Sequence, residues 1–378
     1  MDVVDFCTKL IKCQSVTPYD DGAIDCIDVF LSGIGFETKI LQFKSEDGSN
    51  VVKNLFAKIG NPEKKTLGFL GHSDVVVPGD GWECNPFEGV QVAGHLVGRG
   101  VADMKGGIAA FCCAVAKFID KNQDTFEGAI EFLITGDEEI GSYEGARSLI
   151  KWCDENGNIP DDCLVGEPSS FNNVGDHIYI GHRGSLNVSV KAFGQQGHVA
   201  YPEYYQNSLA NICGYISQIK NYEWKHEDKR YPRTNLEPTM LFTNNYAENV
   251  VPDMSSARLN IRYGADYTAG DLKKICEKES KQYDVVLDFT HSADPYISDD
   301  PALKNILSAA IADITGISPI YSCGGGTSDG RYIFPYCNVI EFGLPGSSIH
   351  QKNEKAKVDD LLILEKIYLS FIEKYFAH

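Results

Sequence analysis

Three short apolar stretches of this chain each end in side chains that can bind a metal ion. They cover residues 66–70, 129–135 and 162–165. His72 follows the first stretch, Glu138 and Glu139 follow the second, and Glu167 follows the third. Short apolar runs bounded by turn residues are typical of strands buried in a sheet. Since α/β proteins usually bind ligands where their strands end, the pattern predicts an α/β fold with a metal site at that edge of the sheet.

A glycine-rich stretch, Gly98–Gly107, surrounds a further carboxylate, that of Asp103. Apolar side chains follow it at helical spacing, from Ile108 to Ile119. We therefore expect Asp103 in a tight turn before a helix, where glycines let the backbone bend and pack closely. A carboxylate held there can share its two oxygens between two metal ions. Alone, an acidic residue near a helix start is more typical of a cap or of a partner of the helix dipole.

One further histidine, His350, lies in a loop before the last helix that the sequence predicts. The candidate metal ligands are then His72, Asp103, Glu139, Glu167 and His350. Imidazole and carboxylate groups suit zinc, with cobalt or manganese as substitutes. Two Zn²⁺ ions, three carboxylates and a bridging hydroxide sum to zero charge, which makes burial of the set tolerable. Glu138 is then a free carboxylate beside a metal-bound water, where a general base is expected.

The length of 378 residues favours two domains. Beyond residue 184 the pattern changes to half-buried strands and helices in the order β-α-β-β-α-β, which is typical of a small two-layer domain inserted into the chain. Its predicted elements are strands over 186–192, 239–243, 256–263 and 285–290 and helices over 209–219 and 271–283. Elsewhere we predict helices over 2–12, 22–33, 144–153, 302–314 and 358–375, and strands over 36–43, 51–59, 320–321 and 339–342.

Charge and cysteine content exclude several classes of protein. The formal net charge of −19 argues against nucleic acid or an anionic membrane as a partner. Twelve cysteines without a CxxC pair argue against a cysteine-bound zinc or a thioredoxin-like motif. No charged-then-apolar leader opens the chain and no apolar run approaches 18 residues, so we expect a soluble cytoplasmic protein. A glycine run at 324–326 lacks the GK[ST] that phosphate-binding loops carry, which disfavours nucleotide binding.

Several motifs of the chain resemble those of one enzyme family. They are GHSD, GRGVADMKGG, GDEEIGS and VGEPSS. In this order they are similar to motifs of the co-catalytic zinc aminoacylase/carboxypeptidase G metallopeptidases, and the resemblance spans nearly the whole chain. Further motifs are similar to the branch that hydrolyses N-succinyl-LL-2,6-diaminopimelate to succinate and LL-2,6-diaminopimelate, in lysine and diaminopimelate biosynthesis. They are HRGS, QGHVAYP, NVVP, CGGGTSDGR and IHQKNE.

This resemblance implies a fold and an assembly. The fold is α/β, with a phosphorylase/hydrolase-like zinc peptidase catalytic domain formed by residues 1–183 and 296–378. The inserted βαββαβ, ferredoxin-like domain of residues 184–295 is then a lid and a dimerisation domain. The implied protein is a homodimer with two Zn²⁺ per subunit, for which Co²⁺ or Mn²⁺ can substitute, and it acts on a small N-acyl-amino-acid substrate.

The same resemblance assigns roles to residues. His72 and Glu167 are expected to bind one zinc ion, Glu139 and His350 the other, and Asp103 is expected to bridge them. Three catalytic roles follow: Asp74 orients His72, Glu138 is the general base, and His198 crosses to the partner's site to stabilise the oxyanion. The implied substrate-binding residues are Arg183, Ser185, Tyr201, Asn249, Arg262 and Thr327, although a solvated surface is the alternative for such positions.

The chain departs from that branch at two positions associated with the substrate's acyl carboxylate. His182-Arg183 stands where a double arginine is usual, and Gly346 stands where asparagine is usual. Histidine cannot fully replace the bidentate guanidinium fork. Deacetylation of acetylornithine, or hydrolysis of another N-acyl-amino acid or a dipeptide, is therefore an alternative activity. More distant alternatives are a non-catalytic metal-binding protein of the same fold and a single structural zinc site.

Overall fold

A computed structural model describes residues 2–44, 48, 50–122, 125–140, 144–324 and 326–377. The chain divides into two compact units. Unit 1 comprises Met1–Gly181, Ser298–Ser322 and Ser328–His378, and unit 2 comprises His182–Ile297 and Cys323–Thr327. The end of the GDEEIGS motif, from Gly141, and Gly325 of the glycine run lie outside the described residues.

The main sheet of unit 1 contains parallel strands at its centre. Its strands are β1 (Glu37–Lys44), β2 (Val51–Gly60), β3 (Thr66–His72), β6 (Ala129–Thr135), β7 (Asp162–Val165), β8 (His177–His182) and β17 (Asn338–Glu341). They follow the order β1-β2-β6-β3-β7-β17-β8, and β16 (Ile320–Gly324) also pairs with β8. β6, β3, β7 and β17 are parallel, so the carboxyl ends of β3, β6 and β7 meet at one edge. A smaller sheet joins β4 (Val90–Val92), β5 (His95–Val97) and β18 (Lys355–Lys357).

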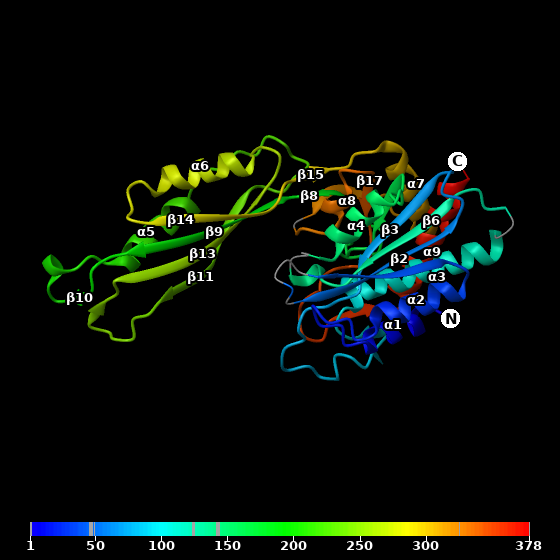
Figure 1. Cartoon of the computed structure of the whole chain (residues 1–378), viewed down its shortest axis with the longest axis horizontal. Coiled ribbons are helices and arrows are strands. Elements are labelled where there is room, and N and C mark those ends of the chain that lie inside the picture. Colours follow the sequence, from blue (N-terminus) through cyan, green and yellow to red (C-terminus); the bar gives the residue numbers. More distant parts are fainter. Residues whose placement is uncertain are drawn as a thin grey trace. The chain divides into compact units, whose positions relative to one another are not determined.

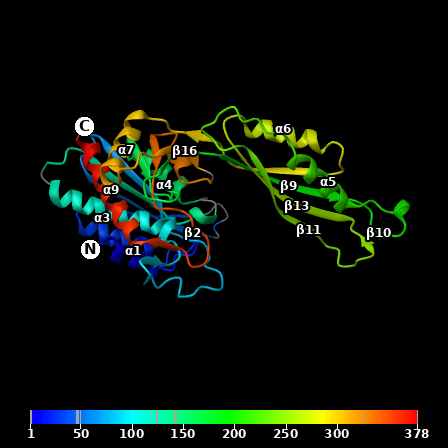
Figure 2. The same cartoon turned by 180° about the vertical axis from the view of Figure 1, so that it is seen from behind.

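Helices cover both faces of the main sheet (Figures 1 and 2). The helices of unit 1 are α1 (Val3–Lys12), α2 (Ala23–Gly33), α3 (Gly106–Asn122), α4 (Ala146–Glu155), α7 (Pro301–Thr315), α8 (Gly330–Ile333) and α9 (Val358–Phe376). On one face, Phe69 of β3 stacks on Phe111 of α3, which meets Tyr368 of α9 edge-on. On the other face, Leu133 of β6 belongs to a buried apolar cluster with Leu149 of α4. Successive side chains of the strands thus point alternately into two apolar cores, one on each side of the sheet.

Unit 2 is a two-layer domain. Its elements are β9 (Gly184–Phe193), β10 (Gly197–His198), α5 (Ser208–Lys220), β11 (Asn235–Thr243), β12 (Val250–Val251), β13 (Met254–Tyr263), α6 (Ala269–Ser280), β14 (Val286–Ala293) and β15 (Tyr296–Ile297). The antiparallel sheet has the order β11-β13-β9-β14. α5 and α6 pack on one face through a buried cluster that includes Val188, Ile212 and Leu272. The predicted βαββαβ order is confirmed, with β10 and β12 as an added two-stranded ribbon.

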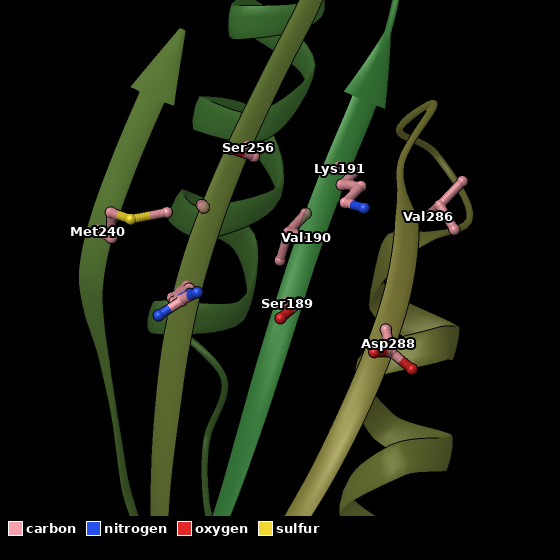
Figure 3. A pocket seen from close by; sticks show the side chains of 9 residues that line it. Ser189, Val190, Lys191, Met240, Ser256, Val286 and Asp288 are labelled. Atoms are coloured by element: carbon pink, nitrogen blue, oxygen red, sulfur yellow. The ribbon is translucent and has the colours of Figure 1, made fainter. Parts of the chain in front are cut away.

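The face of this sheet that points away from α5 and α6 carries polar side chains (Figure 3). A hollow of about 430 Å³ lies there, with Lys191 of β9, Arg258 of β13 and Asp288 of β14 among its lining residues. Met240 of β11 contributes an apolar wall. This face therefore combines both signs of charge with a partly apolar surface.

Several elements differ from their predictions. The helix predicted over 271–283 ends at Ser280, because the chain turns there and Tyr283 N–H donates to the Ser280 carbonyl. The helix predicted from residue 144 begins at Ala146. The small β4-β5-β18 sheet was not predicted, since its three-residue strands are too short for a periodic pattern. Among the described residues, no helix has the length and apolarity needed to cross a bilayer.

Candidate metal centre

The predicted ligands from the main sheet meet at one edge. His72 is the last residue of β3. The parallel neighbour β6 ends level with it at Thr135, and β7 ends at Val165, which pairs with Leu70. The His72 ring is buried, with Nδ1 3.0 Å from the carbonyl oxygen of Asp74 and Nε2 3.1 Å from Oδ1 of Asp103. Oε1 of Glu167, which follows β7, lies 3.7 Å from the same Nε2. One imidazole nitrogen therefore faces two carboxylates.

Asp103 lies in an irregular segment, Val101–Lys105, immediately before α3. Its backbone is not helical (φ −126°, ψ 94°), and Gly100 before it has a φ of +83°. A Cβ at Gly100 would lie 2.4 Å from Cγ1 of Val75, so glycine is required both by conformation and by space. The predicted turn before a helix is confirmed, and the turn directs the buried Asp103 carboxylate toward the histidines.

The second histidine lies on the opposite side of Asp103. Nε2 of His350 is 3.4 Å from Oδ2 of Asp103, whereas Nε2 of His72 faces Oδ1. The same His350 nitrogen lies 3.0 Å from Oε2 and 3.1 Å from Oε1 of Glu139. Two histidine–glutamate pairs thus flank one shared aspartate. Within the described part of the chain, one group of potential metal ligands lies close enough together to hold an ion, and it contains His72, Asp103 and Glu139.

Asp74 connects β3 to the turn that carries both glutamates. Its Oδ1 and Oδ2 accept the backbone N–H groups of Glu138 and Glu139, each at 3.2 Å. The Thr17 hydroxyl donates to Oδ2 of the same carboxylate at 2.5 Å. Asp74 therefore fixes the backbone of the Glu138–Ile140 turn as well as the environment of His72.

The charges of the centre are unbalanced without a cation. Its carboxylates are those of Asp74, Asp103, Glu138, Glu139 and Glu167, against the imidazoles of His72 and His350. Burial raises the pKa of Glu138 well above its usual value, and the carboxylate of Asp329 raises it further, against the effect of His72. Burial likewise raises the pKa of Glu167, and Asp103 adds to the effect. A site in which buried carboxylates repel one another is suited to divalent cations.

The histidines respond to the same excess of negative charge. Burial alone lowers the pKa of His72, but hydrogen bonds with Asp103 and Asp74 raise it well above its usual value. Hydrogen bonds with Asp103 and Glu139 raise the pKa of His350 to about 10. Burial would raise the pKa of Asp103, but its bonds with the two histidines lower it. Protonated imidazoles thus neutralise part of the charge that a bound metal would neutralise, and the donor set fits such ions.

One residue of the centre was not among the predictions. Glu354 is buried, and its carboxylate accepts hydrogen bonds from the segment that presents Asp103. Glu354 follows His350 by four residues in the IHQKNE motif. The sequence interpretation used only the histidine of this motif. The glutamate at the end of the motif was the signal that could have indicated Glu354.

The other predicted site residues belong to unit 2, where they form two groups at opposite ends of its sheet. At the β10 end, His198 pairs with Val250 of β12, and the N–H of Val199 donates to the carbonyl of Asn249 at 3.1 Å. The ring of Tyr201 lies 5.5 Å from the ring of His198. His198, Tyr201 and Asn249 are therefore neighbours, and all three are exposed.

The second group lies where β9 begins and β13 ends. Ser185 of β9 is directly opposite Arg262 of β13 in the sheet register. Nη1 of Arg183 donates to Oδ1 of Asn235 at 2.7 Å, and burial followed by the charge of Arg262 lowers the pKa of Arg183. Thr327 ends a segment that touches this region, since the N–H of Arg183 donates to the carbonyl of Gly324.

Comparison with protein families identifies the fold. The model of peptidase family M20/M25/M40 matches residues 68–374, which cover the centre and most of both units. The chain belongs to this family. Its membership confirms the resemblance on which the sequence interpretation depended.

Relatives in the M20/M25/M40 family match over nearly their whole length. The chain is 40% identical over 376 residues to a succinyl-diaminopimelate desuccinylase of Rhodopseudomonas palustris (strain TIE-1), with 97% of each chain covered. It is 40% identical over 383 residues to the succinyl-diaminopimelate desuccinylase of Ehrlichia canis (strain Jake), with 100% of this chain and 99% of the other covered.

Solved structures of M20-type proteins share the fold at low sequence identity. A tripeptidase from Staphylococcus aureus superposes with a TM-score of 0.81 at 19% identity, covering 100% of this chain and 98% of the other. A dinuclear metal-binding peptidase of the M20 family from Bacillus subtilis superposes with a TM-score of 0.64 at 14% identity, covering 98% and 99%. The catalytic-plus-inserted-domain architecture is thus the fold of this family.

Proposed function

We propose that this protein hydrolyses N-succinyl-LL-2,6-diaminopimelate to succinate and LL-2,6-diaminopimelate. The observation that carries the proposal is the 40% identity to curated succinyl-diaminopimelate desuccinylases over 97% of the chain or more. The arrangement of the two histidine–glutamate pairs around Asp103 supports it, because such a donor set can hold metal ions that promote amide hydrolysis. The substrate is then a small N-acyl-amino acid.

The proposed cofactor is a pair of Zn²⁺ ions, with Co²⁺ or Mn²⁺ as substitutes. His72 and Glu167 would hold one ion, Glu139 and His350 the other, and Asp103 would bridge them, as the contacts of 3.0–3.7 Å within each histidine–glutamate pair allow. When bound, two such cations would supply the polarisation of the acyl carbonyl and the lowered pKa of the attacking water. The dinuclear relative from Bacillus subtilis supports a two-ion site.

Within this centre, Glu138 takes the catalytic proton. Burial raises its pKa, and cations held beside it would favour the carboxylate form that accepts a proton. As the oxygen of the attacking water forms a bond to the acyl carbon, its proton passes to Glu138. Glu138 then gives this proton to the amide nitrogen as the C–N bond breaks, which releases the carboxylic acid and the amine. Asp74 keeps Glu138 in place by holding the N–H groups of its turn, and it keeps His72 in place from behind.

The residues of unit 2 supply the remaining roles. We assign oxyanion stabilisation to His198 of the partner subunit, since His198 is exposed and held at the β10–β12 ribbon. The substrate's carboxylates are proposed to bind Arg183, Ser185, Arg262 and Thr327. The path by which the substrate enters is proposed to be lined by Tyr201 and Asn249. In this scheme His182 and Gly346 modify how the succinyl carboxylate is held.

We propose residues 1–183 and 296–378 as the catalytic domain and residues 184–295 as lid and dimerisation domain. The free edge of strand β11 supports a homodimer, because Met240, Leu241 and Phe242 are exposed along it. A hollow beside α5, lined by Ile216 and Leu241, extends this apolar surface. A cytoplasmic setting agrees with cysteines that are present as thiols, such as Cys7, Cys112 and Cys163, and with a biosynthetic reaction.

The test is a substrate panel with the zinc-loaded protein. We expect the highest kcat/KM for N-succinyl-LL-2,6-diaminopimelate among N-acetylornithine, other N-acyl-amino acids and dipeptides, measured as release of a primary amine. Elemental analysis should give two zinc ions per chain. A higher kcat/KM for N-acetylornithine would replace the proposed substrate and favour the alternative that His182 and Gly346 raise. No turnover of any amide would overturn the proposal.

A further inference from the structure

We infer that Glu354 is a positioning residue of the metal centre, whose carboxylate holds the segment that presents Asp103 and joins it to the loop that carries His350. The inference rests on the proposed metal site and concerns a residue that would not itself bind the ions. It follows from the hydrogen bonds of Glu354, from the backbone they stabilise and from where Glu354 lies in the chain.

Both oxygens of Glu354 accept hydrogen bonds from the segment around Asp103. Oε1 accepts the N–H groups of Ala102 at 3.0 Å and of Asp103 at 3.3 Å. Oε2 accepts the N–H of Gly100 at 3.0 Å and Nη1 of Arg99 at 2.7 Å. A single buried carboxylate is thus surrounded by four donors, three of them from the backbone.

These donors converge because the segment is not a regular helix. Asp103 has extended backbone angles and Gly100 has a positive φ, so the N–H groups between them cannot all pair with carbonyls as they would in a helix. A buried N–H without a partner costs about 1–3 kcal/mol. Glu354 provides those partners, and the irregular backbone that directs the Asp103 carboxylate toward both histidines depends on it.

Arg99 balances the charge of Glu354. It is almost fully buried, its guanidinium lies over the Trp82 ring at 5.2 Å, and Nη2 donates to the Pro78 carbonyl at 3.3 Å. A buried ion pair is tolerable when its remaining donors and acceptors are satisfied. Removal of the negative charge of Glu354 would leave Arg99 uncompensated in the protein interior, so the local backbone would shift.

The position of Glu354 in the chain is set independently of any metal. The N–H of Gly98 donates to its carbonyl at 3.0 Å, and Lys355 directly after it pairs with Val97 in the β5–β18 ladder. His350 lies four residues before it in the same loop. Glu354 therefore couples the two stretches of chain that supply Asp103 and His350, and its loss should weaken the binding of both ions.

The test compares the metal affinity of Glu354→Gln with that of the parent protein. Glutamine keeps the size of the side chain but turns an NH₂ group toward backbone donors. We expect zinc to bind about 10–100-fold more weakly, as is typical when a group that orients a ligand is changed. A chromophoric chelator in competition measures the affinity, and the zinc-induced rise of Tm gives a second readout that needs no turnover. At saturating zinc, kcat should fall while KM changes little.

Glu365→Gln is the matched control. Glu365 is also a buried carboxylate of unit 1 with a cationic partner, Lys117 at 2.7 Å, but it lies on α9. Its substitution should change the Tm of the metal-free protein and leave the zinc affinity unchanged. If Glu354→Gln fails to fold, the zinc affinity of Glu354→Asp is measured instead. Aspartate keeps the negative charge, but its shorter side chain lies farther from the same donors.

Three outcomes separate the hypotheses. Weaker zinc binding by folded Glu354→Gln or Glu354→Asp, but not by Glu365→Gln, supports the inference. Parent-like zinc affinity in the folded Glu354 variants overturns it, even if their metal-free Tm falls, because Glu354 would then be merely structural. If the parent protein itself binds no divalent cation, the proposed metal site fails and the inference fails with it.

Discussion

Glu138 is enclosed beside the five proposed ligands, and Asp74 holds its turn by accepting the backbone N–H of Glu138. We predict that Glu138→Gln keeps the metals and loses turnover, because glutamine cannot accept the proton. General-base catalysis contributes about 10²–10⁴-fold, so kcat should fall by at least that factor. Steady-state kinetics with elemental analysis of the same sample measures both properties.

Glu155→Gln, an exposed carboxylate change on α4, is the control for this variant and should leave kcat unaltered. Retained turnover in Glu138→Gln would remove Glu138 as the base. Loss of bound metal in that variant would instead make Glu138 a ligand, contrary to the proposed assignment.

Glu131 is a buried carboxylate outside the proposed metal centre, located inside β6 and far along that strand from the edge where His72 lies. Burial raises its pKa from 4.5 to about 7, opposed by Lys58 on β2 and assisted by Asp161. As pH rises from 4.5 to 7, the unfolded chain releases this proton while the folded protein keeps it, so folding stability falls over that window. The difference corresponds to about 3 kcal/mol at neutral pH and above.

We predict that Glu131→Gln stabilises the protein at pH 8 by up to about 3 kcal/mol and has little effect at pH 4.5. The free energy of unfolding, measured by urea titration at several pH values, checks this. A stability difference that stays constant from pH 4.5 to 8 would show that Glu131 titrates normally in the folded protein.

Single residues of the centre were predictable when their own side chain carried the chemistry. His72 and Glu139 follow apolar strands, and the sequence alone predicts that they meet. Glu354 and the second role of Asp74 were not predictable, because these carboxylates bind backbone N–H groups of segments distant in sequence. Nothing in the composition of a segment indicates which of its N–H groups lack a helical partner until its backbone is known.

At the scale of elements, the start of α3 packs against the end of β7 through two glycines. A Cβ at Gly107 would lie 2.5 Å from the carbonyl oxygen of Gly166, the residue before Glu167. We predict that Gly107→Ala destabilises the metal-free protein by about 1–3 kcal/mol, as is usual for overpacking. Zinc affinity should fall as well, because the added methyl group separates the segments of Asp103 and Glu167.

Gly33→Ala is the control within the same unit. Gly33 ends α2, and a Cβ there would have no heavy atom within 4 Å. The free energy of unfolding of Gly33→Ala should equal that of the parent protein or exceed it by up to about 1 kcal/mol, because alanine restricts the unfolded chain. Thermal unfolding of both variants without metal gives the comparison, and equal Tm values for the two would contradict the close contact.

The central strands were the most predictable elements. β6 and β7 have the boundaries that their apolar runs predict, because each is buried on both faces and bounded by turn residues. β8 was not predicted, and β5 pairs with a strand some 260 residues away along the chain. Strand pairing between segments so far apart in the sequence depends on tertiary contacts, and the local pattern of apolar residues carries no information about those contacts.

At the scale of the whole molecule, the proposed homodimer depends on the β11 edge of unit 2. Leu241 is 51% exposed and faces the hollow beside α5. We predict that Leu241→Lys shifts the protein toward monomers, since a charge on an edge strand opposes pairing with a second sheet. Sedimentation velocity across a concentration series measures the shift.

Val286→Lys tests the opposite edge of the same sheet. Val286 lies on β14, is 58% exposed, and should tolerate lysine without a change of oligomeric state. A monomeric parent protein, or dissociation caused by Val286→Lys alone, would remove β11 as the proposed contact.

Unit 1 is built from stretches of chain that come before and after unit 2. During synthesis, the segments that carry His72, Asp103, Glu139 and Glu167 therefore leave the ribosome first. The pairing of β17 with β7 and the contact of Tyr368 with Phe111 form only later. During that interval the growing polypeptide exposes an unfinished apolar layer, a state prone to aggregation. Loading of the proposed metal centre has to await the synthesis of His350, so the interval before that step is the vulnerable stage in producing this protein.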